Sequence, residues 1–227
     1  MTNDIIISGS GLCRHYHRGS ETVRALDGVD IDVRAGESVC ILGPSGSGKT
    51  TLINLLSALD APTAGTLTID GCRVDGLPER KLVNIRRGSL GYVFQKFHLI
   101  PTLTVAENVA LPLLFLGRQP DPGALAHVLE SVGLADRATH LPKELSGGQM
   151  QRVAVGRALI THPRVLIADE PTGNLDRQTG DTVFELFLKA VHEDGVALVL
   201  TTHNLALAAR CDRTLTLEDG KVVVPAA

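Results

Sequence analysis

A glycine-rich segment that ends in a lysine and two threonines has the residue types that bind phosphate. It reads Gly43-Pro44-Ser45-Gly46-Ser47-Gly48-Lys49-Thr50-Thr51, follows an apolar stretch and precedes a helical pattern, which is the setting of a P-loop. Glycines let the backbone wrap phosphate groups, Lys49 supplies a positive charge to the β- and γ-phosphates, and Thr50 offers a hydroxyl to Mg²⁺. We therefore expect a magnesium nucleotide here; the alternative is a glycine turn with an incidental lysine.

A second glycine turn, Leu145-Ser146-Gly147-Gly148-Gln149, occurs much later in the chain. It also opens a segment with helical apolar spacing, and the free N–H groups at a helix start favour a bound phosphate. One nucleotide cannot easily occupy both turns. The second turn is therefore predicted to act on the nucleotide of a neighbouring copy.

Two adjacent carboxylates, Asp169 and Glu170, follow the apolar stretch Val165 to Ala168. Side chains alternate along a strand, so the two carboxylates should point in different directions. One can face the water shell of Mg²⁺ while the other faces an attacking water. The alternative is that both simply solvate the end of a strand.

Three further side chains have polar or aromatic groups suited to a nucleotide site. His203 and Gln95 each close a predicted strand, which places them near a γ-phosphate, a metal ion or a water, although either can be purely structural there. Tyr16 can supply the flat partner that an adenine ring needs, and core packing is its competing role. For the flanking His15 and His17 the sequence supplies no matched ligands, so we expect them at the surface.

The elements that must position these residues predict an α/β fold. Strands are expected at 5–8, 28–33, 38–42, 66–70, 90–94, 165–168 and 197–200, and helices after Lys49, from Ser146 and around 183–191. Buried strands alternating with helices indicate a mainly parallel core sheet, and the first strands an antiparallel one. Between them, residues 96–161 should form a helical subdomain, with Pro101, Pro112, Pro120 and Pro122 as breaks.

Composition limits the classes of function that remain. The 227 residues, 44% of them hydrophobic, suit one domain, and a net charge of −3 without a basic stripe argues against nucleic acid as a partner. Four cysteines (Cys13, Cys40, Cys72 and Cys211) stand far apart, which predicts neither a zinc site nor a redox dithiol and fits a reducing cytosol. We expect no signal peptide and no membrane span, because the longest apolar stretch is short and contains Pro112.

Taken together, the motifs resemble the ATP-binding subunits of ABC transporters. The resemblance rests on residues 43–51, Gln95, the Ser146 turn, Val165 to Glu170, and His203, in that order, and it covers almost the whole chain. It implies a P-loop NTPase core with a mainly parallel sheet, an N-terminal antiparallel β-subdomain and an inserted α-helical subdomain. In this reading residues 1–227 are one ABC ATPase domain: 1–95 and 162–227 form the core and β-subdomain, and 96–161 the helical subdomain with the signature motif.

The same resemblance assigns roles to individual residues. The resemblance implies Glu170 as the general base. It implies Lys49 and His203, the switch histidine, as further catalytic residues, and Tyr16 as the residue that stacks on adenine. Thr50, Gln95 and Asp169 are implied at the metal, Asp169 through a water. The run Asn174-Leu175-Asp176 matches the D-loop that crosses between subunits. Asn204, after the switch histidine, departs from the aspartate usual in the family.

A narrower resemblance concerns the lipoprotein-releasing and macrolide-export group (LolD and MacB), and within it the YbbA-like ATPases. It rests on residues 60–65, 99–109, 170–181 and 208–213. Its implications are ATP and Mg²⁺ as cofactors, ATP hydrolysis, a head-to-tail homodimer around two MgATP, and a separate membrane permease that docks near Lys96 to Leu116.

The implied location is the cytoplasm, on the inner face of the cell membrane through the permease. An FtsE-like regulatory ATPase, which signals through its membrane partner without transport, is the alternative. DNA-repair and ribosome-associated ABC ATPases are disfavoured because the chain has no room for their insertions or second nucleotide domain. The substrate, the direction of its movement and the identity of the partners are not encoded in these residues.

Overall fold

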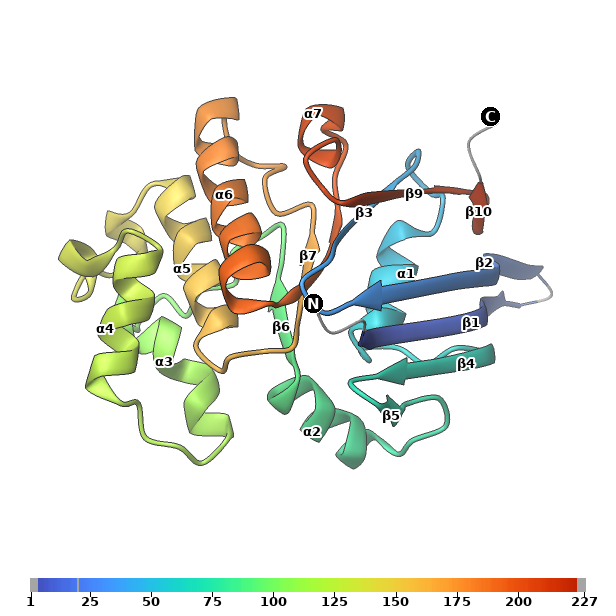
Figure 1. The fold of residues 1–227 in the computed structure, drawn as a ribbon, viewed down its shortest axis with the longest axis horizontal. Coiled ribbons are helices and arrows are strands. Elements are labelled where there is room, and N and C mark those ends of the chain that lie inside the picture. Colours follow the sequence, from blue (N-terminus) through green and yellow to red (C-terminus); the bar gives the residue numbers. More distant parts are fainter. Residues whose placement is uncertain (1–3, 20, 224–227) are drawn as a thin grey trace.

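The computed structural model describes residues 4–19 and 21–223, and a six-stranded sheet runs through the middle of the molecule (Figure 1). Its strand order is β10-β9-β3-β8-β7-β6. Five strands are mutually parallel, and β10 pairs antiparallel with β9 at one edge. The strands are β3 (Ser38–Leu42), β6 (Leu90–Val93), β7 (Val165–Asp169), β8 (Ala197–Thr201), β9 (Arg213–Glu218) and β10 (Lys221–Val223).

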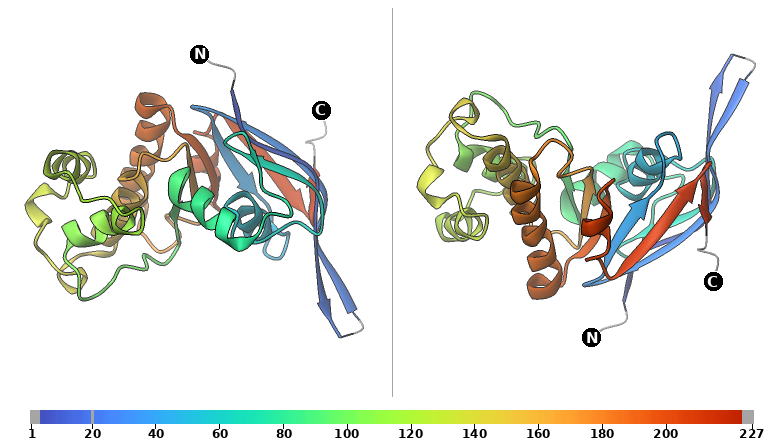
Figure 2. Two further views of the ribbon diagram at one scale, coloured as in Figure 1. Left: turned by 90° about the horizontal axis from the view of Figure 1, so that it is seen from below. Right: turned by 90° about the horizontal axis from the view of Figure 1, so that it is seen from above.

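A second, antiparallel sheet of four strands is built mainly from the start of the chain. Its order is β2-β1-β4-β5, with β1 (Ile5–Arg18), β2 (Glu21–Arg34), β4 (Ala64–Ile69) and β5 (Cys72–Arg73). The β1–β2 hairpin is long and projects from the body of the molecule (Figure 2). Helix α1 (Lys49–Leu56) packs between the two sheets, and its buried Leu52 and Leu55 belong to one apolar cluster with strands of both.

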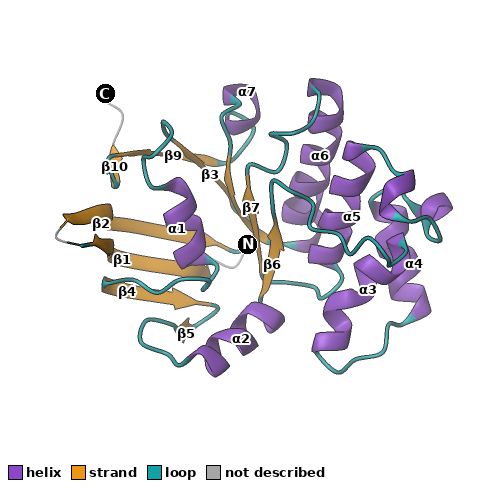
Figure 3. Cartoon of the chain, turned by 180° about the vertical axis from the view of Figure 1, so that it is seen from behind, coloured by secondary structure: helices purple, strands orange, loops and turns teal. Residues whose placement is uncertain are grey.

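The remaining long helices cover the opposite side of the six-stranded sheet from α1 (Figures 1 and 3). They are α3 (Val105–Phe115), α4 (Pro122–Ser131), α5 (Gly147–Leu159) and α6 (Arg177–Asp194), with single 3₁₀ turns at Ala135–Arg137 and Pro142–Glu144. A second apolar cluster joins these helices to the sheet. The short helices α2 (Glu79–Gly88) and α7 (Leu205–Ala208) lie at the ends of strands β6 and β8.

The predicted fold class is confirmed: a mainly parallel sheet, an antiparallel N-terminal sheet and an intervening helical region are all present. Three local expectations were wrong. The apolar spacing after Lys49 predicts a helical face that includes Leu59, but the helix ends at Leu56 and Leu59 is half exposed. Pro112 does not break a helix but lies inside α3, whereas Pro122 does stand at a helix boundary, as the first residue of α4. Helix α2 was not expected, because it is strongly charged and buries only Leu82.

Candidate nucleotide-binding site

The P-loop joins the end of β3 to the start of α1, and its glycines are required by close backbone approaches. A Cβ on Gly43 would lie 2.1 Å from the carbonyl oxygen of Leu217. A Cβ on Gly48, the N-cap of α1, would lie 2.4 Å from the carbonyl oxygen of Ala25, and Gly48 has a φ of 104°. Side chains at these two positions would therefore displace the loop from the neighbouring strands.

Lys49 folds back onto the loop and concentrates positive charge at the start of α1. Its Nζ donates hydrogen bonds of 2.8 Å to the carbonyl oxygens of Gly43 and Pro44, and the residue is only 8% exposed. The hydroxyl of Ser47 is buried and has no hydrogen-bond partner among the described residues. A buried ammonium group, an unpaired hydroxyl and a helix N-terminus together suit an anion such as a phosphate.

A cavity of about 460 Å³ opens beside the P-loop and brings together motifs that are far apart in sequence. Asp169 and Glu170 reach it from the end of β7, and His203 from the loop after β8. The parallel strands β3, β7 and β8 carry their carboxyl ends to the same sheet edge, which is where α/β proteins bind ligands. The full lining is Val23, Arg24, Ala25, Ser45, Gly46, Gly48, Lys49, Thr50, Thr51, Asp169, Glu170, His203, Asp219 and Gly220.

Asp169 and Glu170 are held differently although they are adjacent. The hydroxyl of Thr201 donates a 2.7 Å hydrogen bond to Oδ1 of Asp169 and accepts one of 3.0 Å from the backbone N–H of Glu170. Glu170 has a φ of 47°, in the left-handed region that a glutamate rarely adopts. The backbone therefore turns between the two residues, and strain of this kind is common at functional sites.

The carboxylate of Glu170 faces the imidazole of His203. Oε1 lies 2.8 Å from Nε2 of His203, with the glutamate side chain 15% exposed and the histidine 64% exposed. The two atoms are at ion-pair distance but are not aligned as a hydrogen bond, so the buried Oε1 has no such partner among the described residues. Burial raises the pKa of Glu170 above its ordinary value, and the charges of His203 and Lys49 oppose that rise. A carboxylate of raised pKa with a free oxygen is suited to accept a proton from water.

The second glycine turn begins helix α5 and does not reach the P-loop cavity. Ser146 is the N-cap: its hydroxyl accepts a 3.3 Å hydrogen bond from the N–H of Gln149, whose side chain accepts one of 2.8 Å from the N–H of Ser146. The turn opens instead into a separate hollow of about 290 Å³. That hollow is lined by Ser146, Gly148, Gln149, Arg152, Gln178, Thr179, Thr182 and Val183. The two cavities share no residue, and the second contains no carboxylate and no lysine.

Gln95 and the predicted D-loop lie next to each other, outside the P-loop cavity. The side-chain amide of Asn174 donates a 3.1 Å hydrogen bond to the backbone oxygen of Gln95. Leu175 packs against the edge of the helical apolar cluster. Asp176 is the N-cap of α6, and hydrogen bonds from Thr179 hold the pKa of its carboxyl below the ordinary value.

Tyr16 does not line the P-loop cavity. Its hydroxyl donates a 2.9 Å hydrogen bond to Asp60, and the guanidinium of Arg14 lies 4.6 Å from its ring centroid. Its partner in the β1–β2 pairing is Val23, which does line the cavity. The ring is therefore one strand away from the cavity wall.

Two polar residues on α5, Gln151 and Arg157, donate hydrogen bonds to the segments that follow β6 and β7, and sequence reasoning missed them. Gln151 is fully buried, and its amide donates to the carbonyl oxygens of Phe94 (3.3 Å) and Pro171 (2.6 Å). The guanidinium of Arg157 donates to the carbonyl oxygens of Phe97 and His98, and burial lowers its pKa. The available signal was polar side chains within the apolar spacing of Met150, Val153 and Ala154.

The unusual Asn204 also has a structural explanation. Its side-chain oxygen accepts hydrogen bonds from the N–H groups of Ala206 (3.0 Å) and Leu207 (3.4 Å), so it caps the short helix α7. Asparagine is as good as aspartate in this position. The substitution therefore removes a charge beside His203 without removing the cap.

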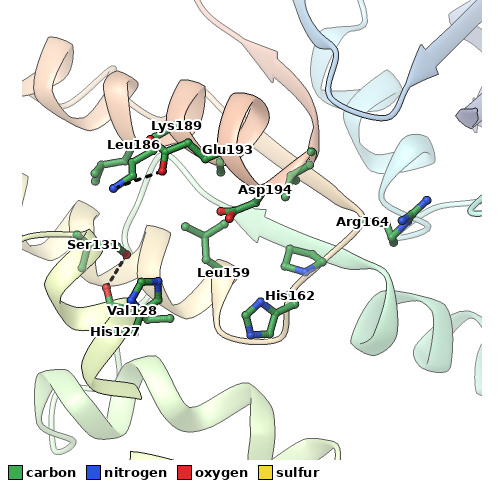
Figure 4. A pocket seen from close by; sticks show the side chains of 15 residues that line it. His127, Val128, Ser131, Leu159, His162, Arg164, Leu186, Lys189, Glu193 and Asp194 are labelled. Carbon is green, nitrogen blue, oxygen red and sulfur yellow. Dashed lines mark hydrogen bonds and ion pairs between the residues drawn. The ribbon is translucent and has the colours of Figure 1, made fainter. Parts of the chain in front are cut away.

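A third hollow, of about 320 Å³, lies between α4, the end of α5 and α6 (Figure 4). Its polar groups are largely used within single helices: Lys189 pairs with Glu193 at 3.7 Å, and the hydroxyl of Ser131 donates to the carbonyl oxygen of Val128 at 2.8 Å. It has no glycine turn and no carboxylate at a strand end. The P-loop cavity is therefore the better candidate for chemistry.

Comparison with known proteins assigns the family. Residues 26–173 match the family described as ABC transporter. The lipoprotein-releasing system ATP-binding protein LolD of Shewanella frigidimarina is 42% identical over 100% of this chain and 96% of its own. The uncharacterized ABC transporter ATP-binding protein YknY of Bacillus subtilis is 41% identical, over 96% of this chain and 95% of its own.

A solved structure gives the same answer. The dimeric ATP-binding cassette MJ0796, bound to ADP and Pi in a post-hydrolysis state, superposes with a TM-score of 0.87 at 40% identity, covering 96% of this chain and 97% of that one. ATP is thus the nucleotide of this family, and its hydrolysis is the reaction. The chain belongs to the ABC transporter family, as an ATP-binding domain with ATPase activity.

Proposed function

We propose that the chain forms a head-to-tail homodimer around two MgATP and drives a separate membrane permease of the lipoprotein-release or macrolide-export type. One observation carries the dimer: the P-loop cavity and the hollow at the Ser146 turn have no residue in common. Within one chain the second turn cannot cap the nucleotide of the first. In a head-to-tail pair, each Ser146 turn faces the γ-phosphate held by the other copy.

The residues of the P-loop cavity fit MgATP. Lys49 Nζ is bonded only to backbone carbonyls, which a phosphate can replace, and Ser47 and Glu170 each keep a buried oxygen without a hydrogen bond among the described residues. Thr50 would hold Mg²⁺ directly and Asp169 through a water, and oxygen donors are the ligands that Mg²⁺ prefers. Gln95, which lies outside the cavity in this structure, would join them only by moving its side chain toward the metal. When bound, the metal would neutralise negative charge on the phosphates.

Each side chain of the cavity then has a defined task in hydrolysis. Glu170 orients the attacking water and accepts its proton, for which its raised pKa and free Oε1 prepare it. His203, 2.8 Å away, fixes the position of that carboxylate. Lys49 and the Ser146 turn of the second copy stabilise the charge that develops on the transferred phosphoryl group. Tyr16 would stack on adenine by leaving its bond to Asp60.

The proposed permease site is the segment from Lys96 to Leu116. It exposes three large apolar side chains, Ile100 (41%), Leu114 (57%) and Phe115 (59%). The guanidinium of Arg87 lies 5.8 Å from the Phe115 ring centroid and covers that ring in part. No helix in the described residues is both long and apolar enough to cross a membrane, so work on a membrane substrate requires a partner. A peripheral position on the inner face of the membrane follows, and the relatives named LolD favour lipoproteins as the load.

The docking proposal is tested by capture from detergent-solubilised membranes of the source organism. The wild-type chain should retain a permease, identified by mass spectrometry, and Phe115→Ser should lose it while keeping the wild-type ATPase rate in solution. Leu205→Ser, at an exposed leucine on α7, is the matched control and should capture as the wild type does. Equal capture by all three chains would exclude this segment as the docking site.

The dimer proposal is tested by mixing two inactive chains, Lys49→Ala and Ser146→Arg. In a head-to-tail pair both defects fall in one site, and the other site is intact. With equal amounts, half of the dimers are mixed, so about a quarter of the wild-type ATPase rate should return. The control is a chain that carries both substitutions, mixed with Ser146→Arg: no dimer in that mixture has an intact site, so no activity should return. Absence of recovery in the first mixture would exclude the shared site.

A further inference from the structure

A cysteine, a histidine and an aspartate come together in the antiparallel sheet, away from the catalytic carboxylates. One ligand atom each from Cys13, His15 and Asp27 lies within 4.8 Å of the other two. The expectation that His15 has no matched ligands was therefore wrong. The partners were hidden because Asp27 lies on the opposite strand of the hairpin.

The pairing of β1 with β2 explains why these side chains meet. Cys13 and His15 are two positions apart on β1, a spacing that puts side chains on one face of a strand. Leu26 pairs with Arg14, so Asp27, the next residue of β2, comes beside Cys13. The register shifts on both sides of Arg14, and such bulges re-aim side chains.

The backbone at this point is anchored from both sides. Strand β1 lies between β2 and β4 in the sheet. The carbonyl oxygen of Cys13 accepts a 2.7 Å hydrogen bond from the N–H of Thr63, and the N–H of His15 donates one of 3.0 Å to the hydroxyl of Thr63. Two of the three side chains are thus fixed on one rigid stretch of strand, as a binding site requires.

The imidazole of His15 carries an unused nitrogen. Its Nε2 is buried and has no hydrogen-bond partner among the described residues. The nearest acidic oxygen is Oδ1 of Asp27, at 4.0 Å, which is too long for a hydrogen bond. Burying a polar nitrogen without a partner is unfavourable, so a ligand that uses its lone pair would be stabilised there.

The nearby positive charges leave one oxygen of Asp27 available. Lys221 Nζ and Arg24 Nη1 lie 3.4 and 3.8 Å from Oδ2, the other carboxylate oxygen. Both basic side chains are about two-thirds exposed, so solvent screens them from a cation at Oδ1. The carboxylate can bridge these cations and a metal ion at the same time.

We propose that Cys13, His15 and Asp27 bind a zinc ion, with water as the fourth ligand. Thiolate, imidazole and carboxylate are the donors that Zn²⁺ takes in tetrahedral sites, where neighbouring donor atoms are about 3.5 Å apart. To bind the ion, the donor atoms must come closer than their present spacing, and the Cys13 thiol must leave the carbonyl oxygen of Gly11, which lies 3.5 Å away. The Cys13 thiol releases its proton to solvent on binding, so affinity falls as the pH is lowered.

The position of this site suggests what the metal would affect. The N–H of Asp27 donates a 2.9 Å hydrogen bond to the carbonyl oxygen of Gly220, which lines the P-loop cavity. Tyr16 follows His15 directly in β1. A bound ion would therefore stiffen the strand pair that forms one wall of the nucleotide cavity. The metal site itself rests on no assumption about transport or dimerisation.

Titration of the full chain with Co²⁺ tests the proposal, because a thiolate ligand gives Co²⁺ a charge-transfer band in the near ultraviolet. One equivalent of Co²⁺ should produce the band, and Zn²⁺ should abolish it. Cys13→Ser should remove it. Cys72→Ser, at an exposed cysteine, and Cys211→Ser, which breaks the buried thiol pair with Cys40, are matched controls and should retain it.

Two further variants cover the case in which Cys13→Ser fails to fold. Asp27→Asn, which keeps the size of the side chain, and His15→Asn, which replaces the imidazole by a smaller polar group, should weaken Zn²⁺ binding at least about tenfold in competition with a chromogenic chelator. Zn²⁺ should raise the melting temperature of the wild type more than that of either variant. A cobalt band that survives Cys13→Ser would overturn the proposed site, and so would a zinc affinity that is unchanged in both asparagine variants. Metal binding only at Asp169 and Glu170 would give no thiolate band, and that result would also overturn the proposed site.

Discussion

The two glycine turns of this chain start from the same physics and differ in what surrounds them. Both begin a helix, and both present N–H groups to an anion. The P-loop cavity also contains Lys49, Asp169, Glu170 and His203, whereas the hollow at Ser146 offers hydroxyls, amides and Arg152 but no carboxylate and no lysine. The first region is equipped for hydrolysis, and the second only for recognition. In the head-to-tail dimer that we propose, a site with both functions is complete only when two chains meet.

The largest effect should come from removing the base on the catalytic side of this comparison. Glu170→Gln keeps the shape of the side chain but cannot accept a proton, so turnover should fall about a hundredfold to ten-thousandfold. ATP binding should persist, and the dimer should accumulate with MgATP on gel filtration. Glu130→Gln, at an exposed glutamate on α4, is a charge-matched control and should change neither rate nor assembly. A wild-type rate in Glu170→Gln would remove this carboxylate from the mechanism.

A smaller effect is expected at the Ser146 turn, from a change in the packing of α5 against α6. A Cβ on Gly148 would lie 2.1 Å from Cγ2 of Thr179, so Gly148→Ala must push α5 away from α6. Overpacking of this kind costs about 1–3 kcal/mol of unfolding free energy, and the ATPase rate should fall with it. Adding Thr179→Ala removes the clashing methyl and should restore both quantities.

Gly147 gives the matched comparison within the same turn. A Cβ there meets nothing closer than Leu175 Cδ2 at 3.7 Å, an ordinary contact. Gly147→Ala should therefore leave the unfolding free energy nearly unchanged, and any loss of ATPase rate reports on the surface that faces the other copy. If Gly148→Ala loses neither stability nor rate, the close packing of α5 on α6 does not position the turn.

The pH dependence of hydrolysis tests the P-loop cavity alone. On the acid limb, kcat should fall about tenfold for each pH unit. Glu170 works as a base only when ionised, and burial raises its pKa, so the acid limb of kcat should lie at higher pH than for an exposed glutamate. His203 opposes the rise; therefore His203→Gln should move the limb to still higher pH. ATP binding to Glu170→Gln, measured over the same range, is the control for titration of the nucleotide. A limb that His203→Gln shifts to lower pH would contradict this assignment.

The parts of the fold that flank the motifs could be predicted from sequence. Continuous apolar runs such as Val165 to Ala168 are typical of buried parallel strands. A P-loop motif also predicts a strand directly before it and a helix directly after it. These elements therefore placed Lys49, Asp169 and His203 at one sheet edge correctly, because parallel strands bring their carboxyl ends together.

Other features could not be predicted, because they depend on tertiary contacts. The hairpin strands extend far beyond the predicted 5–8 and 28–33, since register shifts around Leu12 to His15 interrupt the period of two. The hydrogen bonds of Gln151 and the cluster around Cys13 depend on residues that belong to other helices and strands. The position of Tyr16, with its hydroxyl on Asp60, likewise follows from packing that no local pattern encodes.

The smallest effect separates recognition from helix capping, and it uses two matched helix starts. Ser146 caps α5 and Thr104 caps α3: each hydroxyl accepts a 3.3 Å hydrogen bond from the N–H three residues on, and the N–H of each cap residue donates to the side chain of that same residue, Gln149 or Glu107. Replacing either with alanine should cost about 1 kcal/mol of unfolding free energy in chemical denaturation.

Only Ser146→Ala should also weaken the MgATP-dependent dimer, measured by analytical ultracentrifugation of both variants in the Glu170→Gln background. The reason is that in the proposed dimer the Ser146 hydroxyl would gain a second partner, a phosphate oxygen of the nucleotide held by the other copy, whereas Thr104 caps a helix within its own chain. If the two alanine variants lose the same stability and dimerise equally well, Ser146 is no more than a helix cap. The difference between the two glycine turns would then lie in Gly147, Gly148 and the helix dipole alone, because these are the anion-binding groups that an alanine at 146 leaves in place.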